Sequence, residues 1–203
     1  RTDLSAYKNV RKQGLIAIGL DEGDEIAGVR MTGGDSQLIV ATRMGMAIRI
    51  KETNIRNMSR SAHGVKAITL REGDSVVSMA RVREGASVLT VTEGGLGRKT
   101  NLDEYRIQNR GGLGLKNYRS GDDHVCGIKV IDEEDDITMI ASDGVVIRLR
   151  ASDIRPMSRY ARGVRLMKLS GESKVVAFTR AERDESAETA VIQDRSEEHT
   201  SEL

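Results

Sequence analysis

Aromatic residues are nearly absent from this chain of 203 residues: they make up 2% of it, with no Trp and one Phe. A core must therefore be built from Val, Ile, Leu, Met and Ala. The chain also holds one Pro and one Cys, so a framework of disulfides is excluded. Cys126 lies in the apolar run HVCGIKV, which predicts a buried, inert thiol and fits a cytoplasmic protein.

Long apolar runs and clustered metal ligands are missing as well. No run approaches the roughly 18 residues of a membrane span, so no membrane partner is expected. The three His residues share no ligand spacing with Cys126, and no metal or other cofactor is predicted for this chain. The acidic run DEEDD at 132–136 lacks the spacing of a calcium loop and is interpreted as a solvated turn. No catalytic constellation is present.

An octet of similar sequence recurs about every fifty residues. SRSAHGVK begins at Ser59, NRGGLGLK at Asn109 and SRYARGVR at Ser158. Such a period is the signature of a repeat architecture. Alignment on the octet glycine predicts one partial unit and three full units, at about 1–34, 35–84, 85–133 and 134–183.

Each full unit carries four strand-like segments with alternating apolar residues. An apolar strand (QLIVAT, SVLTVT, ITMIAS) and a glycine turn precede a second strand (MAIRIK, LGRKTN, VVIRLR). A short third strand (VKAITL, LKNY, VRLMKL) follows the octet, and a fourth (VVSMARV, VCGIKVI, VVAFTRA) ends the unit. The partial unit ends in the same way, with LIAIGLDEGDEIAGVRM. The pattern predicts an all-β, propeller-like chain of about three and a half blades.

Basic residues occupy the same four columns in every full unit. Tyr105 by contrast aligns with Ile55 and Ile154, which predicts a core position and no catalytic role. The first to fourth columns are Arg49, Lys99, Arg148; Arg56, Arg106, Arg155; Arg60, Arg110, Arg159; and Lys66, Lys116, Arg165. Further cations flank them, at Lys51, Arg98, Arg150 and Arg162.

Equivalent positions of a propeller lie around one rim, so these columns predict a curved positive track. Duplex DNA, with one charge per roughly 1.7 Å of axis, is the partner that such a track fits. Few aromatics and no recognition helix favour contact with the DNA backbone over single-strand stacking or base reading. Two alternatives remain open: the Arg60 column could bond loop carbonyls within the fold, and the track could bind an acidic protein.

The repeats resemble the C-terminal domain of the DNA gyrase A subunit, a six-bladed β-pinwheel whose blades exchange strands. The segment QNRGGLG at 108–114 is similar to the gyrase box of that family, Q-[RK]-R-G-G-[RK]-G, with Asn109 and Leu113 in place of basic residues. The other two octets resemble the same motif but match it at fewer positions. The resemblance covers 1–183 and places this chain in the later half of the pinwheel, with the intact box upstream.

The resemblance implies a non-catalytic module that binds and wraps duplex DNA, so that the parent enzyme can introduce negative supercoils using ATP. ATP and Mg²⁺ would then bind other domains or subunits, and the protein partners would be a second A subunit together with the gyrase B subunit. The corresponding domain of the topoisomerase IV A subunit is the near alternative.

The C-terminal segment differs in charge from the rest of the chain. Residues 181–203 hold eight acidic and two basic residues, whereas the net charge of the whole chain is +1. We expect 184–194 to be an acidic tail that competes with DNA. The last residues, RSEEHTSEL at 195–203, resemble the translation of a sequencing adapter and are expected to be no part of the natural protein.

Overall fold

The computed structural model describes residues 1–10, 12–119, 121 and 123–181, which fold into β-strands joined by turns and four short 3₁₀ helices. The predicted acidic tail and the adapter-like segment lie outside the described residues. The strands are β1 (Gln37–Thr42), β2 (Met46–Lys51), β3 (Val76–Arg81), β4 (Ser87–Thr92), β5 (Leu96–Asn101), β6 (Leu115–Lys116), β7 (Val125–Ile131), β8 (Asp136–Ala141), β9 (Val146–Arg150), β10 (Val164–Arg165) and β11 (Val175–Ala181). The 3₁₀ helices are η1 (Leu4–Tyr7), η2 (Glu52–Asn54), η3 (Leu102–Glu104) and η4 (Ala151–Asp153).

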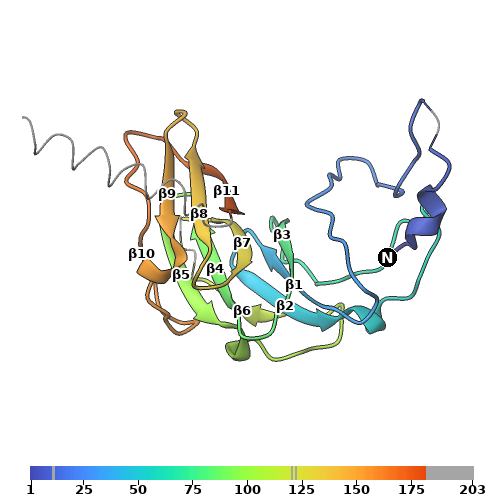
Figure 1. The fold of residues 1–203 in the computed structure, drawn as a ribbon, viewed down its shortest axis with the longest axis horizontal. Coiled ribbons are helices and arrows are strands. Elements are labelled where there is room, and N and C mark those ends of the chain that lie inside the picture. The colour runs from blue at the N-terminus through green and yellow to red at the C-terminus, as the bar shows by residue number, and fades with distance from the viewer. Residues whose placement is uncertain (11, 120, 122, 182–203) are drawn as a thin grey trace, which may run out of the picture.

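The strands form three antiparallel sheets, which confirms the all-β prediction. Their strand orders are β3-β1-β2-β6, β10-β5-β4-β7 and β11-β8-β9. In each sheet the hairpin of the first two strands is flanked on one side by the fourth strand of the same unit. The sheets follow one another across the molecule, and the N-terminal segment extends away from the first sheet (Figure 1).

Two of the sheets are completed by a strand from the following unit. β6 pairs with β2 through Ala47–Leu115 and Met46–Lys116. β10 pairs with β5 in the same way, through Gly97–Val164. Neighbouring units are therefore joined by strand exchange, as the resemblance to a β-pinwheel implies.

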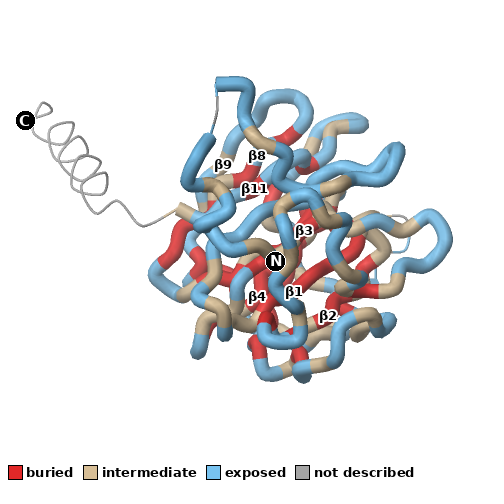
Figure 2. Tube along the Cα trace, turned by 90° about the vertical axis from the view of Figure 1, so that its right-hand side faces the viewer, coloured by how far each residue is buried: buried red, intermediate tan, exposed pale blue. Residues whose placement is uncertain are grey.

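The core consists of aliphatic side chains between successive sheets, as the scarcity of aromatics requires. One cluster joins the first and second sheets through residues such as Ile39, Val88 and Ile128. Another joins the second and third sheets through Leu89 and Met139. Buried residues concentrate on the strands and exposed ones on the connecting loops (Figure 2). A single sheet cannot bury both faces, so this stacking supplies most of the hydrophobic stabilisation.

The predicted strands of the partial unit are not formed. Residues 13–34 contain no strand, and Ile16, Val29 and Met31 are 63–73% exposed. The expected strand VKAITL at 65–70 is not formed either. The repeat geometry explains both results: each of these segments would pair with a preceding sheet, and no such sheet lies among the described residues.

The acidic run at 132–136 forms the predicted turn, but it is solvated only in part, because Glu133 and Glu134 alone are exposed. Asp135 and Asp136 are only 6% and 7% exposed. Asp135 accepts hydrogen bonds from Arg83 and Arg180, and thereby ties the fourth strands of two units together. Arg83 and Arg180 compensate the charge of Asp135, and Arg148 of the same unit compensates that of Asp136, which offsets the cost of burying these carboxylates.

Tyr105 and Cys126 differ in how far they are buried. Tyr105 is 1% exposed and lies in the core, as predicted. Cys126 is partly buried, and desolvation raises the pKa of its thiol to about 11, so little thiolate forms at neutral pH. Among the described residues, no helix has the length and apolar character needed to cross a bilayer.

Candidate nucleic-acid interface

The glycines of the second and third octets are required by strand exchange. Gly114 and Gly163 have φ of 76° and 88°, a backbone region that disfavours other residues. A Cβ on Gly114 would collide with the carbonyl of Ala47, and one on Gly163 with the carbonyl of Gly97. The octet therefore turns the chain at the point where it joins the preceding sheet, so part of its recurrence has a structural cause.

The third column joins adjacent units. The Arg60 guanidinium donates to the carbonyl oxygen of Ile16 at 2.9 Å, and that of Arg110 donates to Lys66 at 3.4 Å. Arg159 makes the equivalent bond to the Lys116 carbonyl. Third-column arginines thus donate to loop carbonyls in all three units, as one of the two alternative interpretations of the columns expected.

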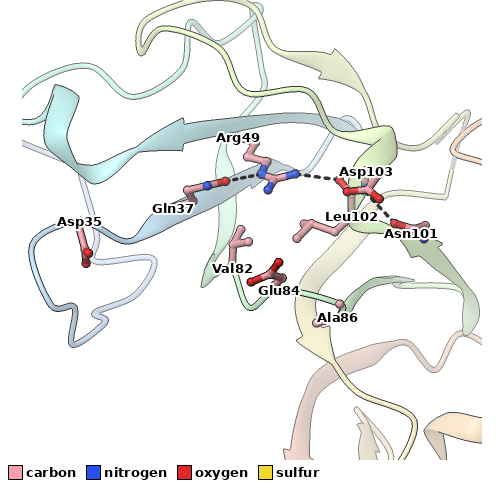
Figure 3. Close-up of a pocket in the computed structure, with 10 residues that line it drawn as sticks. Asp35, Gln37, Arg49, Val82, Glu84, Ala86, Asn101, Leu102 and Asp103 are labelled. Atoms are coloured by element: carbon pink, nitrogen blue, oxygen red, sulfur yellow. Dashed lines mark hydrogen bonds between the residues drawn. The ribbon is translucent and has the colours of Figure 1, made fainter.

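The first column points into the fold. Arg49 donates to Gln37 Oε1 at 2.8 Å and to the carbonyl of Leu102 at 3.1 Å (Figure 3). It also donates to the carbonyl of Tyr105 at 3.1 Å. Desolvation lowers the pKa of Arg49, and the charge of Asp103 opposes that change. These contacts fix the junction between the first two units.

The other two members of the first column are held by carboxylates. Lys99 is 1% exposed, with its ammonium 2.8 Å from both oxygens of Glu133 and 2.9 Å from the carbonyl of Ala151. Arg148 donates to Asp136 at 2.7 Å. A buried, paired ammonium cannot meet an external phosphate, so Lys99 does not belong to the candidate interface.

The second and fourth columns are exposed. Each second-column Arg follows a 3₁₀ helix, directly after a residue that turns toward the core, such as Tyr105 or Ile154. In the fourth column, Lys116 and Arg165 lie on the exchanged strands β6 and β10, whereas Lys66 lies in the equivalent segment of the first unit, which forms no strand. Within the described residues, none of the six side chains makes a hydrogen bond or ion pair; they are Arg56, Arg106, Arg155, Lys66, Lys116 and Arg165.

Four cations from two units meet where the first sheet joins the second unit. Lys51 and Arg106 line one open pocket together with Asn54. The Arg110 guanidinium donates to the carbonyls of both Asn54 and Lys66, which brings the third and fourth columns together. We call this group, Lys51, Lys66, Arg106 and Arg110, the first junction. No carboxylate among the described residues pairs with it.

The next junction repeats this arrangement with some changes. Arg159 reaches the Lys116 carbonyl and also lies over the ring of Tyr160, at 4.7 Å from its centroid. Glu104 replaces Asn54 and accepts from the Arg159 amide at 2.7 Å. We call Lys116, Arg155 and Arg159 the second junction. Its acidic neighbour makes it less positive than the first.

Arg98, which the sequence suggested as a flanking surface cation, is fully buried. Its guanidinium donates to the carbonyls of Arg159 and Ala161 at 2.8 and 2.9 Å, and to Asn117. Tyr118 lies beneath it at 5.4 Å and donates to the Arg162 carbonyl. Arg98 therefore fixes the third octet. The alignment with Ile48 and Ile147 was the available signal that this position is internal.

Comparison with known proteins relates the chain to one family. A sequence model described as "DNA gyrase C-terminal domain, beta-propeller" matches residues 1–32, 36–83, 86–132 and 135–182. The DNA gyrase A subunit of Clostridium acetobutylicum is 41% identical over 204 residues, covering 100% of this chain and 25% of the relative. Its counterpart from Staphylococcus aureus is 38% identical over 195 residues, covering 93% and 22%. The chain thus spans about a quarter of these curated relatives.

Solved structures support the same fold. The C-terminal domain of a DNA topoisomerase IV superposes with a TM-score of 0.85 at 24% identity, over 96% of this chain and 62% of that one. The structure of a DNA gyrase A C-terminal domain gives a TM-score of 0.76 at 25% identity, over 83% and 58%.

Proposed function

The chain belongs to the DNA gyrase C-terminal domain, β-propeller family, and on that premise we propose that it binds the backbone of duplex DNA along its junction cations. The observation that carries the proposal is the first junction. Lys51, Lys66, Arg106 and Arg110 converge there from two units, and no carboxylate of the described part of the chain pairs with them. Such uncompensated charge favours a polyanion.

The contacts would be electrostatic and independent of base sequence. The junction cations lie on loops, on the two-residue strand β6 and at the last residue of β2, and no α-helix is present among the described residues to enter a major groove. Tyr160 is an exposed aromatic beside a junction, but it is engaged by Arg159, so a platform for stacking unpaired bases is not favoured. Binding should therefore follow the phosphates and the bendability of the duplex.

The successive junctions favour a bent duplex over a straight one. Each junction repeats after one unit, and the units are related by the same strand exchange. A duplex that follows both junctions would bend around the outer strand edges. In the full-length protein this wrapping would support ATP-dependent supercoiling by a gyrase. Its protein partners there would be a second A subunit together with the gyrase B subunit, with ATP and Mg²⁺ bound elsewhere.

The proposal is tested by duplex binding with charge-matched variants. The variant K51A/K66A/R106A/R110A removes the first junction, and K8A/K12A/R71A/R81A removes two Lys and two Arg that are exposed and line neither junction. We expect the first variant to lose at least tenfold in affinity, measured by fluorescence anisotropy, and the second to lose much less. Equal losses would mean that only net charge matters, which would contradict the junction proposal.

Wrapping is tested separately from binding. A relaxed plasmid is incubated with the chain, treated with a nicking-closing topoisomerase and deproteinised, and its topoisomers are separated. Wrapping predicts a shifted linking-number distribution for the wild-type chain and for K8A/K12A/R71A/R81A, and no shift for K51A/K66A/R106A/R110A. Tight binding without any shift would limit the function to attachment.

A further inference from the structure

A second group of cations lies at the sheet edges formed by the fourth strands, opposite the edges that carry β6 and β10. β7 lies between β3 and β11 and contacts both, so the fourth strands of the three full units are neighbours (Figure 1). A pocket of about 300 Å³ opens beside them, and we call it the inner pocket. Its lining residues are Arg30, Ala80, Arg81, Arg83, Lys129, Val130, Thr179 and Arg180. Most of them are basic, and none is acidic.

The register of the fourth strands explains how three units supply cations to one pocket. Arg81 and Arg180 occupy equivalent positions of β3 and β11. On β7 the cation stands one residue earlier, at Lys129. The residues equivalent to Lys129 are Ala80 and Thr179, which are short and line the same pocket. Each full unit therefore contributes at least one cation to the inner pocket.

Two of the cations are already compensated by carboxylates. Arg83 lies 2.8 Å from Asp132 and 3.4 Å from Asp135, and Arg180 lies 3.2 Å from Asp135. Both carboxylates belong to the turn that follows β7 or to its end before β8. These ion pairs hold the two guanidinium groups at the pocket.

The other cations of the inner pocket have no acidic partner within the described part of the chain. Arg81 and Lys129 make no hydrogen bond or ion pair there, and Arg30 donates to the carbonyl of its neighbour Val29. The Lys129 ammonium lies over the ring of Phe178, at 5.8 Å from its centroid. Burial lowers the pKa of Lys129, and the positive charge of Arg30 lowers it further. The pocket therefore carries an excess of positive charge.

The size and charge of the inner pocket together indicate the class of ligand. Its volume is at the lower end of small-molecule sites, which measure about 300–1,000 Å³. A single carboxylate would neutralise one cation, whereas two linked phosphate groups carry several negative charges and offer many acceptor oxygens. Guanidinium groups bind phosphate with two parallel hydrogen bonds, and an ammonium binds it as a point charge.

We propose that the inner pocket, with Arg81, Lys129 and Arg180 from three successive units, binds a small anion that contains two linked phosphate groups. Such a ligand would join the fourth strands of the three units. The site lies at the opposite sheet edges from the junctions, so this proposal goes beyond duplex binding and does not depend on it.

Isothermal titration of the full chain with sodium pyrophosphate, without DNA or divalent metal ions, tests the site. We expect saturable binding by wild type and a loss of at least about tenfold in affinity for Arg81→Ala/Lys129→Met. Asp132 and Asp135 keep their arginine partners in this variant, and the Met side chain can still pack on Phe178. The variant should therefore fold, which circular dichroism verifies.

A charge-matched control separates the pocket from the net charge of the chain. Lys8→Met/Arg71→Ala removes the same two charges from exposed positions that do not line the pocket, and should bind pyrophosphate like wild type. No binding by wild type, or equal losses in the two variants, would overturn the proposal.

Two further titrations identify the source of the phosphates. No aromatic ring lines the pocket, so ADP should bind no more tightly than pyrophosphate. Tighter binding of ADP would keep the site but assign it to a nucleotide. Duplex DNA should bind Arg81→Ala/Lys129→Met as tightly as wild type. A tenfold loss of duplex affinity would place the pocket in the duplex interface and overturn a separate small-anion site, whereas failure of wild type to bind duplex would contradict only the junction proposal.

Discussion

The buried and the exposed cations of this chain perform different tasks, although the sequence presents them in the same repeated columns. Arg98 and Lys99 are fully buried and donate to carbonyls of the following unit, and Lys99 also pairs with the carboxylate of Glu133. Lys66 and Arg106 are exposed and make no such bond within the described part of the chain. The difference shows that a repeated positive charge can hold units together as well as attract a polyanion.

Among the buried cations, we expect substitution of Arg98 to reduce the stability of the fold the most. Ile occupies the equivalent position in the other two sheets, at Ile48 and Ile147. Arg98→Ile therefore keeps a familiar side chain at this position but leaves the carbonyls of Arg159, Ala161 and Asn117 without a donor. Each unsatisfied buried acceptor costs about 1–3 kcal/mol, so we expect a loss of roughly 3 kcal/mol or more in the free energy of unfolding. Urea denaturation measures this loss of stability. Ile48→Val is the control and should lose only about 0.5–1.5 kcal/mol.

Lys99→Met should have a smaller effect on stability. The substitution keeps the apolar stem but removes the ammonium from Glu133 and from the carbonyl of Ala151. Glu133 regains water because its side chain is 58% exposed, so the expected loss is about 1–3 kcal/mol. DNA affinity, measured where the variant is folded, should not change. A stable variant with weakened DNA binding would contradict the structural role of Lys99.

Acid should produce the mildest change in stability. Burial acts to raise the pKa of Glu52, but hydrogen bonds from Thr32, Ser36 and Gly34 together hold it below its ordinary value. Burial likewise opposes the bonds from Arg43 and Lys174 that lower the pKa of Glu93. A lowered folded pKa stabilises above the unfolded value of about 4.3, and this contribution is lost as the pH falls through the folded values.

The variant Glu52→Gln/Glu93→Gln sharpens that expectation. Its urea midpoint should be lower than that of wild type at pH 7 and should change less between pH 7 and pH 4, because the amides do not titrate. An equally steep acid dependence in the variant would assign the effect to other carboxylates.

Much of the fold could be predicted because the repeat carries the same information three times. The alternation in QLIVAT and its equivalents predicted β1, β4 and β8, and the short strands expected after the second and third octets are present as β6 and β10. The strands at 15–20 and 65–70 could not be judged from sequence, because a strand exists only beside a pairing partner. The periodicity of a segment does not indicate whether a neighbouring sheet is available to pair with it.

The candidate interface was less predictable than the fold. Four columns agree in charge, but charge alone does not tell whether a side chain points into a junction between units. Lys99 is buried because Glu133 lies within reach in the fold, 34 residues away in sequence. The run at 132–136 is anchored for the same reason. Such compensation depends on three-dimensional neighbours, which a column of like residues does not reveal.

The most direct test of the junction proposal is the salt dependence of duplex binding by wild type, Arg106→Ala and Arg81→Ala. Both arginines are exposed, but Arg81 lies on β3, at the opposite edge of the first sheet from β6. We expect Arg106→Ala to reduce the magnitude of the slope of log K against log salt by about 0.9, and Arg81→Ala to leave the slope unchanged. Both substitutions should alter the free energy of unfolding by less than about 0.5 kcal/mol. Equal slopes for all three proteins would contradict the account.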